Sequence, residues 1–295
     1  MPTSPALDGI IAVPATPFTS DNQVDVESIR RYARKALAAG VVGFLAPADA
    51  GEVGTLSQAE RDLVVTTFLD EIKGRVPLIG GATDADPQAC LAHARRYIGL
   101  GCAGVLAYIK FQDEASYVAQ VRALDALNPG FLMVQDLDRG QAPLPVSLVA
   151  RLHRECARLA WVKVETNDRC PKISAIREAT GGSLRIGTAG PDLIELMDRG
   201  VQAYMPTLYH EVYVRIWNLH RAGRREEAVA LYYRLLPCLA FNAGHKHMAN
   251  HTKKAVLQAE GIFTTRVVRA ADRAPDPVEA RLLAEICQYG LGLSA

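Results

Sequence analysis

Several features that would assign this chain to a class of protein are scarce or missing. The 295 residues carry a formal net charge of +1, so no overall field attracts nucleic acid or an acidic membrane surface. No apolar run approaches the roughly 20 residues of a membrane-spanning helix, and residues 1–5 lack the basic and apolar regions of a secretory signal peptide. We therefore expect a cytoplasmic protein with no nucleic-acid or membrane partner.

Residues that hold metals or form cross-links are also sparse. The six cysteines lie far apart with no CxxC spacing, which is typical of free thiols in a reducing compartment. His245, His247 and His251 lie close together near the C-terminus but have no neighbouring cysteine or carboxylate in the sequence. We interpret these histidines as solvated or capping residues, and we predict no metal site.

A repeating pattern fills the first 208 residues. Eight short apolar runs, typical of strands, alternate with amphipathic stretches typical of helices. The runs are residues 9–13, 41–45, 76–79, 104–108, 131–134, 160–163, 183–186 and 201–205. The helical stretches include residues 26–38, 58–71, 87–100 and 147–158. Glycines that favour a helix C-terminus follow several of them: Gly40, Gly74, Gly101 and Gly200.

This alternation predicts an α/β fold, specifically a (β/α)8 TIM barrel. A doubly wound sheet is disfavoured because no G-x-G-x-x-G motif follows the first run. After residue 208 helical patterns follow one another without strands, at residues 211–221, 225–241, 247–258 and 277–291. We predict a barrel domain over residues 1–222 and a C-terminal helical extension over residues 223–295 that packs on it.

The sixth apolar run leads into two charged residues, Lys163 and Glu165. Such runs are typical of strands buried on both faces, where a charged amine is costly unless it is paired or deprotonated. A desolvated amine is a nucleophile toward carbonyl groups, so Lys163 is predicted to form imines; the alternative is a structural lysine. Side chains alternate along a strand, so Lys163 and Glu165 face the same way. They are either an amine with its acid–base partner or a plain buried ion pair.

The active site of a TIM barrel lies at the carboxyl ends of the strands. Tyr108, Thr188 and Tyr204 fall near three of these predicted ends, which makes them candidate substrate-binding residues. Thr188 belongs to the glycine-rich segment 187–190, which precedes a helix predicted to begin near Pro191. Backbone N–H groups at such a turn suit a carboxylate or a phosphate.

Motifs along almost the whole chain resemble the dihydrodipicolinate synthase/N-acetylneuraminate lyase family of Schiff-base TIM-barrel enzymes. They are residues 14–18 (PATPF) with Val24-Asp25, Gly51-Glu52 with Thr55-Leu56-Ser57 and Glu60-Arg61, residues 75–79 (RVPLI), Lys163, and Lys253-Lys254-Ala255 before Gly261. The resemblance implies that Lys163 forms an imine with the C2 ketone of a 2-oxo acid. It also implies a homotetramer, built as a dimer of dimers, and no cofactor.

Two departures from the family bear on the substrate. The family's glycine-threonine-threonine-glycine-glutamate loop, which binds the substrate carboxylate, here reads Ala48 to Glu52 and lacks both threonines. The resemblance nevertheless implies that Asp49, Ala50, Gly51 and Glu52 line the substrate site. The family's catalytic tyrosine on strand five is replaced by Gln135, which cannot titrate.

A further carboxylate-binding candidate is Arg139, because a guanidinium matches the geometry of a carboxylate. Strands five and six, in residues 134–136 (VQD) and 163–166 (KVET), are similar to the 2-keto-3-deoxy-L-arabonate dehydratase branch of the family. The resemblance therefore favours a hydro-lyase that dehydrates a 2-keto-3-deoxy sugar acid, with Lys163, Glu165 and Gln135 as catalytic residues. Two alternatives stay open: retro-aldol cleavage of a 2-oxo acid to give pyruvate, and a non-catalytic ligand-binding barrel.

Overall fold

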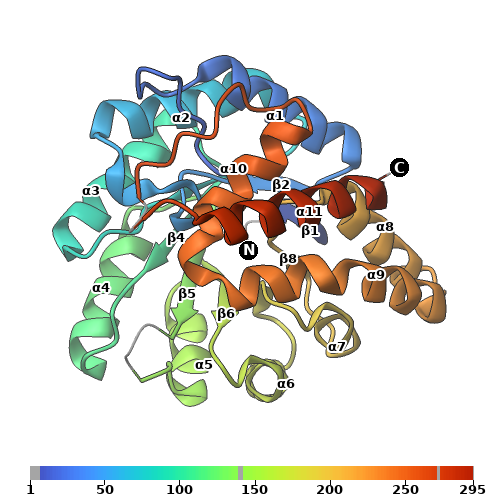
Figure 1. Cartoon of the computed structure of the whole chain (residues 1–295). Helices are drawn as coiled ribbons and strands as arrows, with labels where there is room; N and C mark the ends of the chain where they lie inside the picture. The colour runs from blue at the N-terminus through green and yellow to red at the C-terminus, as the bar shows by residue number, and fades with distance from the viewer. Residues whose placement is uncertain (1–6, 139–141, 271–272, 295) are drawn as a thin grey trace. The chain divides into compact units, whose positions relative to one another are not determined.

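Eight parallel strands close into a barrel in which each strand pairs with the next and β8 pairs with β1. The structure is a computed structural model that describes residues 7–138, 142–270 and 273–294 (Figure 1). The strands are β1 (Gly9–Ala12), β2 (Gly43–Leu45), β3 (Leu78–Gly81), β4 (Gly104–Tyr108), β5 (Leu132–Leu137), β6 (Leu159–Glu165), β7 (Arg185–Thr188) and β8 (Ala203–Tyr204). The predicted (β/α)8 TIM barrel is confirmed.

Helices follow the strands in alternation and then continue without strands, as predicted. The first eight are α1 (Val26–Ala39), α2 (Gln58–Ile72), α3 (Pro87–Leu100), α4 (Glu114–Ala126), α5 (Val146–Glu155), α6 (Arg169–Ala179), α7 (Leu193–Asp198) and α8 (His210–Arg221). They are followed by α9 (Arg225–Gly244), α10 (Ala249–Ala259) and α11 (Pro277–Ser294). Among the residues described, no helix has both the length and the apolar character that crossing a membrane requires.

The structure shifts several predicted element ends. The helix predicted over residues 147–158 ends at Glu155, because Cys156 is already extended and β6 begins at Leu159. The helix expected near Pro191 begins at Leu193. Strand β8 has two residues where five were expected. Hydrogen-bonded pairing with neighbouring strands sets the limits of β6 and β8, and an apolar run in the sequence does not show which of its residues will pair.

The helix ends follow the local signals in the sequence. Ser57 and Glu60 form a reciprocal capping box at the start of α2, which satisfies backbone N–H groups that the helix leaves unpaired. At the other ends, the predicted left-handed glycines are confirmed. Gly40, Gly74, Gly101 and Gly200 all have positive φ angles, which glycine adopts at little cost.

The chain divides into two compact units. The first comprises residues up to 11, 42–45 and 76–205, and holds the barrel strands apart from Ala12. The second comprises residues 12–41, 46–75 and the chain from residue 206 onward, and holds α1, α2 and α8 to α11. The domain boundary that we expect after residue 222 stays a prediction.

Apolar side chains fill each unit. In the first, α3 packs on β3 and β4, α5 and α6 pack on β6, and Trp161, Tyr97 and Phe131 are among the largest fully buried side chains. In the second, α1 packs on α2, while α11 lies against both α9 and α10 (Figure 1). The first unit thus fixes the strand ends on which the candidate catalytic residues lie.

We expect the substitution Gly130→Ala to lower the free energy of unfolding by about 1–3 kcal/mol. A Cβ atom at this position, just before β5, would lie 2.1 Å from the backbone oxygen of Ala103, and neither backbone segment can move without disturbing a strand. The matched control is Gly99→Ala in α3, where a Cβ atom meets no neighbour. The control should be neutral or stabilising by up to about 1 kcal/mol. Equal effects of the two changes in urea unfolding contradict this account.

Candidate active site

Lys163 lies near the carboxyl end of β6 with only 7% of its surface exposed. Its strand neighbours Val162 and Val164 are fully buried on the opposite face. Parallel pairing places its Cα atom beside Gln135 on β5 and beside Gly187 on β7. The expected strand environment of Lys163 is therefore confirmed.

Three residues predicted to be catalytic lie together. The Nζ atom of Lys163 is 3.0 Å from Oε2 of Glu165, and the side-chain amide of Gln135 donates a hydrogen bond of 2.6 Å to the same oxygen. Two donors therefore converge on one carboxylate oxygen. Such a carboxylate is oriented for proton exchange with the amine, and the glutamine holds it in place without titrating.

Register explains this convergence. Gln135 is opposite Lys163, and Leu137 is opposite Glu165, so the glutamine and both charged residues project from the same face of neighbouring strands. The sequence indicates the pairing of Lys163 with Glu165, which lie two residues apart. It does not indicate that Gln135 reaches Glu165, because that contact depends on how β5 and β6 align.

The next residue on β5, Asp136, points to the other face and is almost fully buried. Its carboxylate is 2.5 Å from the Nζ atom of Lys172 in α6, and it accepts a hydrogen bond of 3.0 Å from the backbone N–H of Leu144. These contacts tie β5 to α6 and to the segment before α5. They fix the strand that carries Gln135, and sequence reasoning missed the role of Lys172.

The strand-end residues predicted to bind substrate make structural contacts. The hydroxyl of Thr188 donates a 2.7 Å hydrogen bond to the backbone oxygen of Val164, and the hydroxyl of Tyr204 donates to the backbone oxygen of Gly190. Tyr108 lies opposite Gln135 in the register, and its backbone N–H donates to the hydroxyl of Thr83. Substrate binding by these residues stays a prediction, and Arg139 lies outside the described residues.

The segment Asp49–Glu52, hereafter the 49–52 loop, belongs to the second unit. Asp49, Ala50 and Gly51 form a single 3-10 turn, and Glu52 follows with a left-handed backbone (φ 58°, ψ 35°). A Cβ atom at Gly51 would lie 2.8 Å from the hydroxyl of Thr16 and 2.9 Å from the backbone oxygen of Pro14. Only glycine fits at position 51, because residues of the PATPF motif pack directly against its backbone.

Glu52 is a fully buried carboxylate with three partners. One oxygen is 2.9 Å from the Nζ atom of Lys254 in α10. The other accepts hydrogen bonds from the backbone N–H groups of Arg269 (2.8 Å) and Ala270 (2.7 Å). Breaking such a buried pair leaves an uncompensated charge, which is strongly destabilising. These contacts indicate that Glu52 holds the loop in its left-handed conformation, although its predicted place in the substrate site is untested.

Lys253, the residue before Lys254, also contacts the loop. Its Nζ atom donates a 2.7 Å hydrogen bond to the backbone oxygen of Ala50. Burial lowers the pKa of the Lys253 ammonium group to about 8, against the opposing influence of Glu52. Both lysines belong to the motif that carries the family resemblance, but only the folded chain shows that they converge on the 49–52 loop.

The three histidines near the C-terminus contact protein groups. The rings of His245, His247 and His251 lie within hydrogen-bond distance of the backbone oxygen of Phe241, the carboxylate of Glu279 and the backbone oxygen of Arg273 respectively. In the part of the chain that the structure describes, no group of three or more histidine, cysteine or acidic residues is arranged to hold a metal ion.

The chain is similar to known proteins in sequence and in fold. The model of the Dihydrodipicolinate synthetase family matches residues 6–271. The chain belongs to this family. Among curated relatives of the family, an L-2-keto-3-deoxyarabonate dehydratase of Azospirillum brasilense is 27% identical over 274 residues, covering 89% of this chain and 88% of the relative. A 4-hydroxy-tetrahydrodipicolinate synthase of Methanopyrus kandleri is 25% identical over 307 residues, covering 97% of each.

Solved structures of other proteins share the fold. A putative dihydrodipicolinate synthetase from Pseudomonas aeruginosa has a TM-score of 0.88 at 25% identity, covering 96% of this chain and 99% of that one. An N-acetylneuraminate lyase from Fusobacterium nucleatum complexed with pyruvate has a TM-score of 0.88 at 17% identity, covering 98% of each chain. The latter likeness shows the fold alone.

We expect the pH dependence of stability to change in the variant Lys253→Met. The pKa of about 8 in the folded chain is below the ordinary value of 10.5, so the unfolded chain binds more protons between these pH values. The wild type is therefore stabilised as the pH rises from about 8 to about 10.5. The variant cannot titrate here, so the wild type should gain up to about 3 kcal/mol relative to it over this range. Urea unfolding at several pH values measures the difference; a constant difference contradicts the prediction.

Proposed function

We propose that this protein is a Schiff-base lyase that dehydrates a 2-keto-3-deoxy sugar acid through an imine on Lys163. The observation that carries the proposal is the shared contact of Lys163 and Gln135 with one carboxylate oxygen of Glu165. The relative from Azospirillum brasilense that is named as a dehydratase supports the choice of substrate class.

The first step is imine formation. The amine of Lys163 attacks the C2 ketone, and the carbinolamine loses water to give an iminium ion. The amine must first lose a proton, and the carboxylate of Glu165 lies 3.0 Å away, within reach to accept it. A largely buried amine also loses little hydration when it binds the ketone, because only 7% of Lys163 is exposed.

The second step is the loss of water. The iminium ion draws electrons from C3, so a base removes a proton from C3 to give an enamine. The enamine then expels the C4 hydroxyl once an acid has protonated it, and the C4–O bond breaks. In this scheme Glu165 first returns the lysine proton to the carbinolamine hydroxyl, which leaves as water. The resulting carboxylate then removes the C3 proton and passes it to the C4 hydroxyl, which leaves as a second water molecule. Water hydrolyses the unsaturated iminium ion, which releases an unsaturated 2-oxo acid and regenerates the amine.

The residue beside this carboxylate favours dehydration over carbon–carbon cleavage. Retro-aldol cleavage requires a base that removes the proton of the C4 hydroxyl. The resemblance to the family implies that its tyrosine on strand five has this role. Gln135 stands in its place and cannot accept that proton. Dehydration instead requires that an acid donate a proton to the same hydroxyl. Glu165 can supply this proton while Gln135 holds the Glu165 carboxyl group in place.

Retro-aldol cleavage of a 2-oxo acid is the second candidate. The Methanopyrus kandleri relative, 25% identical and spanning 97% of this chain, is named as a 4-hydroxy-tetrahydrodipicolinate synthase and not as a dehydratase, which supports a second reaction class. Product analysis with 2-keto-3-deoxy sugar acids separates the two reactions. Dehydration retains every carbon atom in one product, whereas cleavage releases pyruvate and an aldehyde.

We expect Lys163→Ala to abolish both turnover and borohydride trapping of a 2-oxo acid, because no other amine replaces the one that forms the imine. The measurement is the intact mass of the protein after reduction with pyruvate or with 2-keto-3-deoxy sugar acids, followed by peptide mapping. Lys246→Met is the control, since it removes an exposed amine from the second unit and should leave the adduct on Lys163. An adduct of equal yield in the Lys163→Ala variant contradicts the scheme.

We expect Glu165→Gln to lower kcat by about 10²–10⁴-fold while borohydride still traps an adduct on Lys163. The amide retains the shape of the side chain but cannot exchange protons. Glu155→Gln, the same change on the surface of α5, should leave kcat unaltered, because its pair with Arg122 is largely exposed. A kcat near the wild-type value for Glu165→Gln would show that another group moves the proton.

A further inference from the structure

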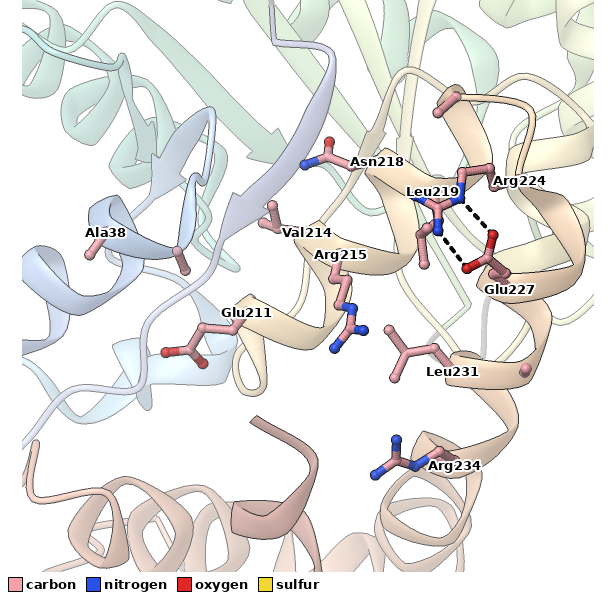
Figure 2. A pocket seen from close by; sticks show the side chains of 13 residues that line it. Ala38, Glu211, Val214, Arg215, Asn218, Leu219, Arg224, Glu227, Leu231 and Arg234 are labelled. Carbon is pink, nitrogen blue, oxygen red and sulfur yellow. Dashed lines mark hydrogen bonds and ion pairs between the residues drawn. The ribbon is translucent and has the colours of Figure 1, made fainter. Parts of the chain in front are cut away.

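The second unit contains a groove that the proposed reaction does not use. Its volume is about 890 Å³, within the range of small-molecule sites. Helices α8 and α9 and the end of α1 supply its walls (Figure 2). The lining includes none of the residues predicted to bind or transform the 2-oxo acid. This arginine groove is lined by Ala38, Ala39, Glu211, Val214, Arg215, Asn218, Leu219, Ala222, Arg224, Glu227, Ala230, Leu231 and Arg234.

Part of the lining is apolar. Leu231 is a buried residue that lines the α9 side, and Val214 and Leu219 line the α8 side. Four alanines also line the groove, and their small side chains leave its volume open. An apolar surface of this kind is favourable for the hydrocarbon part of a ligand.

The acidic residues of the groove already have basic partners. Both oxygens of Glu227 accept hydrogen bonds of 2.6 Å from the guanidinium of Arg224. These bonds hold the pKa of the Glu227 carboxyl below its usual range. Glu211 lies 3.6 Å from the ammonium group of Lys35. Arg224 is therefore the hydrogen-bonding partner of Glu227, although the charge of Arg215 also helps to lower the pKa of that carboxyl. Lys35 is shared between Glu211 and Glu260.

Arg215 and Arg234 have no such partners. Neither guanidinium makes a hydrogen bond or an ion pair with another residue in the ranges that the structure describes, and both residues are exposed. In Figure 2 they extend from α8 and α9 into the same open space beside Leu231. Two converging guanidiniums suit the oxygens of a phosphate or carboxylate, which each binds through paired N–H donors.

We propose that the arginine groove binds a small organic anion, with its phosphate or carboxylate group between Arg215 and Arg234 and its apolar part against Leu219 and Leu231. The charge of the two arginines and the apolar surface beside them select for molecules that carry both features. The proposal is independent of the reaction at Lys163.

The test uses phenyl phosphate as the probe, with inorganic phosphate and benzoate for comparison, in isothermal titration calorimetry on the full-length protein. We expect saturable binding of phenyl phosphate with a Kd below about 1 mM, and weaker binding of inorganic phosphate, which lacks the apolar part. Benzoate shows whether a carboxylate replaces the phosphate. Arg215→Gln and Arg234→Gln should each weaken binding by about ten- to a hundredfold.

Two controls make the result specific. Arg221→Gln removes an exposed charge from the same helix α8 but outside the groove, and should leave the Kd unchanged. Lys163→Ala should also leave it unchanged, which separates the arginine groove from the proposed catalytic site. The proposal is overturned if phenyl phosphate does not bind, if the double variant Arg215→Gln/Arg234→Gln binds it as tightly as wild type, or if Arg221→Gln weakens binding equally.

Discussion

The contact between a buried amine and a carboxylate is the constraint on which the candidate site depends. Lys163 sits among fully buried valines, where an isolated charge is unfavourable, and Glu165 lies 3.0 Å away as its counter-charge. The same carboxylate that makes the burial tolerable is placed to accept a proton from the amine. In the proposed reaction, stability of the strand and reactivity of the lysine would therefore rest on one pair of side chains.

The strand geometry around this pair separates the residues of the candidate site from those that only stabilise the strand. Successive residues of β5 project to opposite faces: Gln135 reaches Glu165, whereas Asp136 pairs with Lys172 and accepts from Leu144 on the other side. A one-residue slip of β5 would exchange these roles and bring a second carboxylate beside Glu165. The buried Asp136–Lys172 pair opposes such a slip, because a shift would leave both charges without partners.

A second buried ion pair orders the 49–52 loop. Glu52 has a left-handed backbone that residues other than glycine seldom adopt, and its carboxylate is held by Lys254 and by two backbone N–H groups more than 200 residues away in the chain. The C-terminal helices thus have a structural task, since α10 supplies both Lys254 and the neighbouring Lys253 to this loop. The family resemblance marks these residues but does not explain why they occur together.

The sequence by itself determined the repeating strand–helix order, the helix caps and the position of Lys163 and Glu165 on one strand face, because these depend on periodicity and on neighbours only a few residues apart. Only the tertiary structure decided that Gln135 binds Glu165, that Lys254 neutralises Glu52, and that Thr188 and Tyr204 donate to backbone oxygens. Strand register and the packing of distant helices create these contacts, and no local pattern encodes which side chains then meet. The tertiary structure likewise decides that Arg215 of α8 and Arg234 of α9 extend into the same groove, since this depends on how the two helices pack.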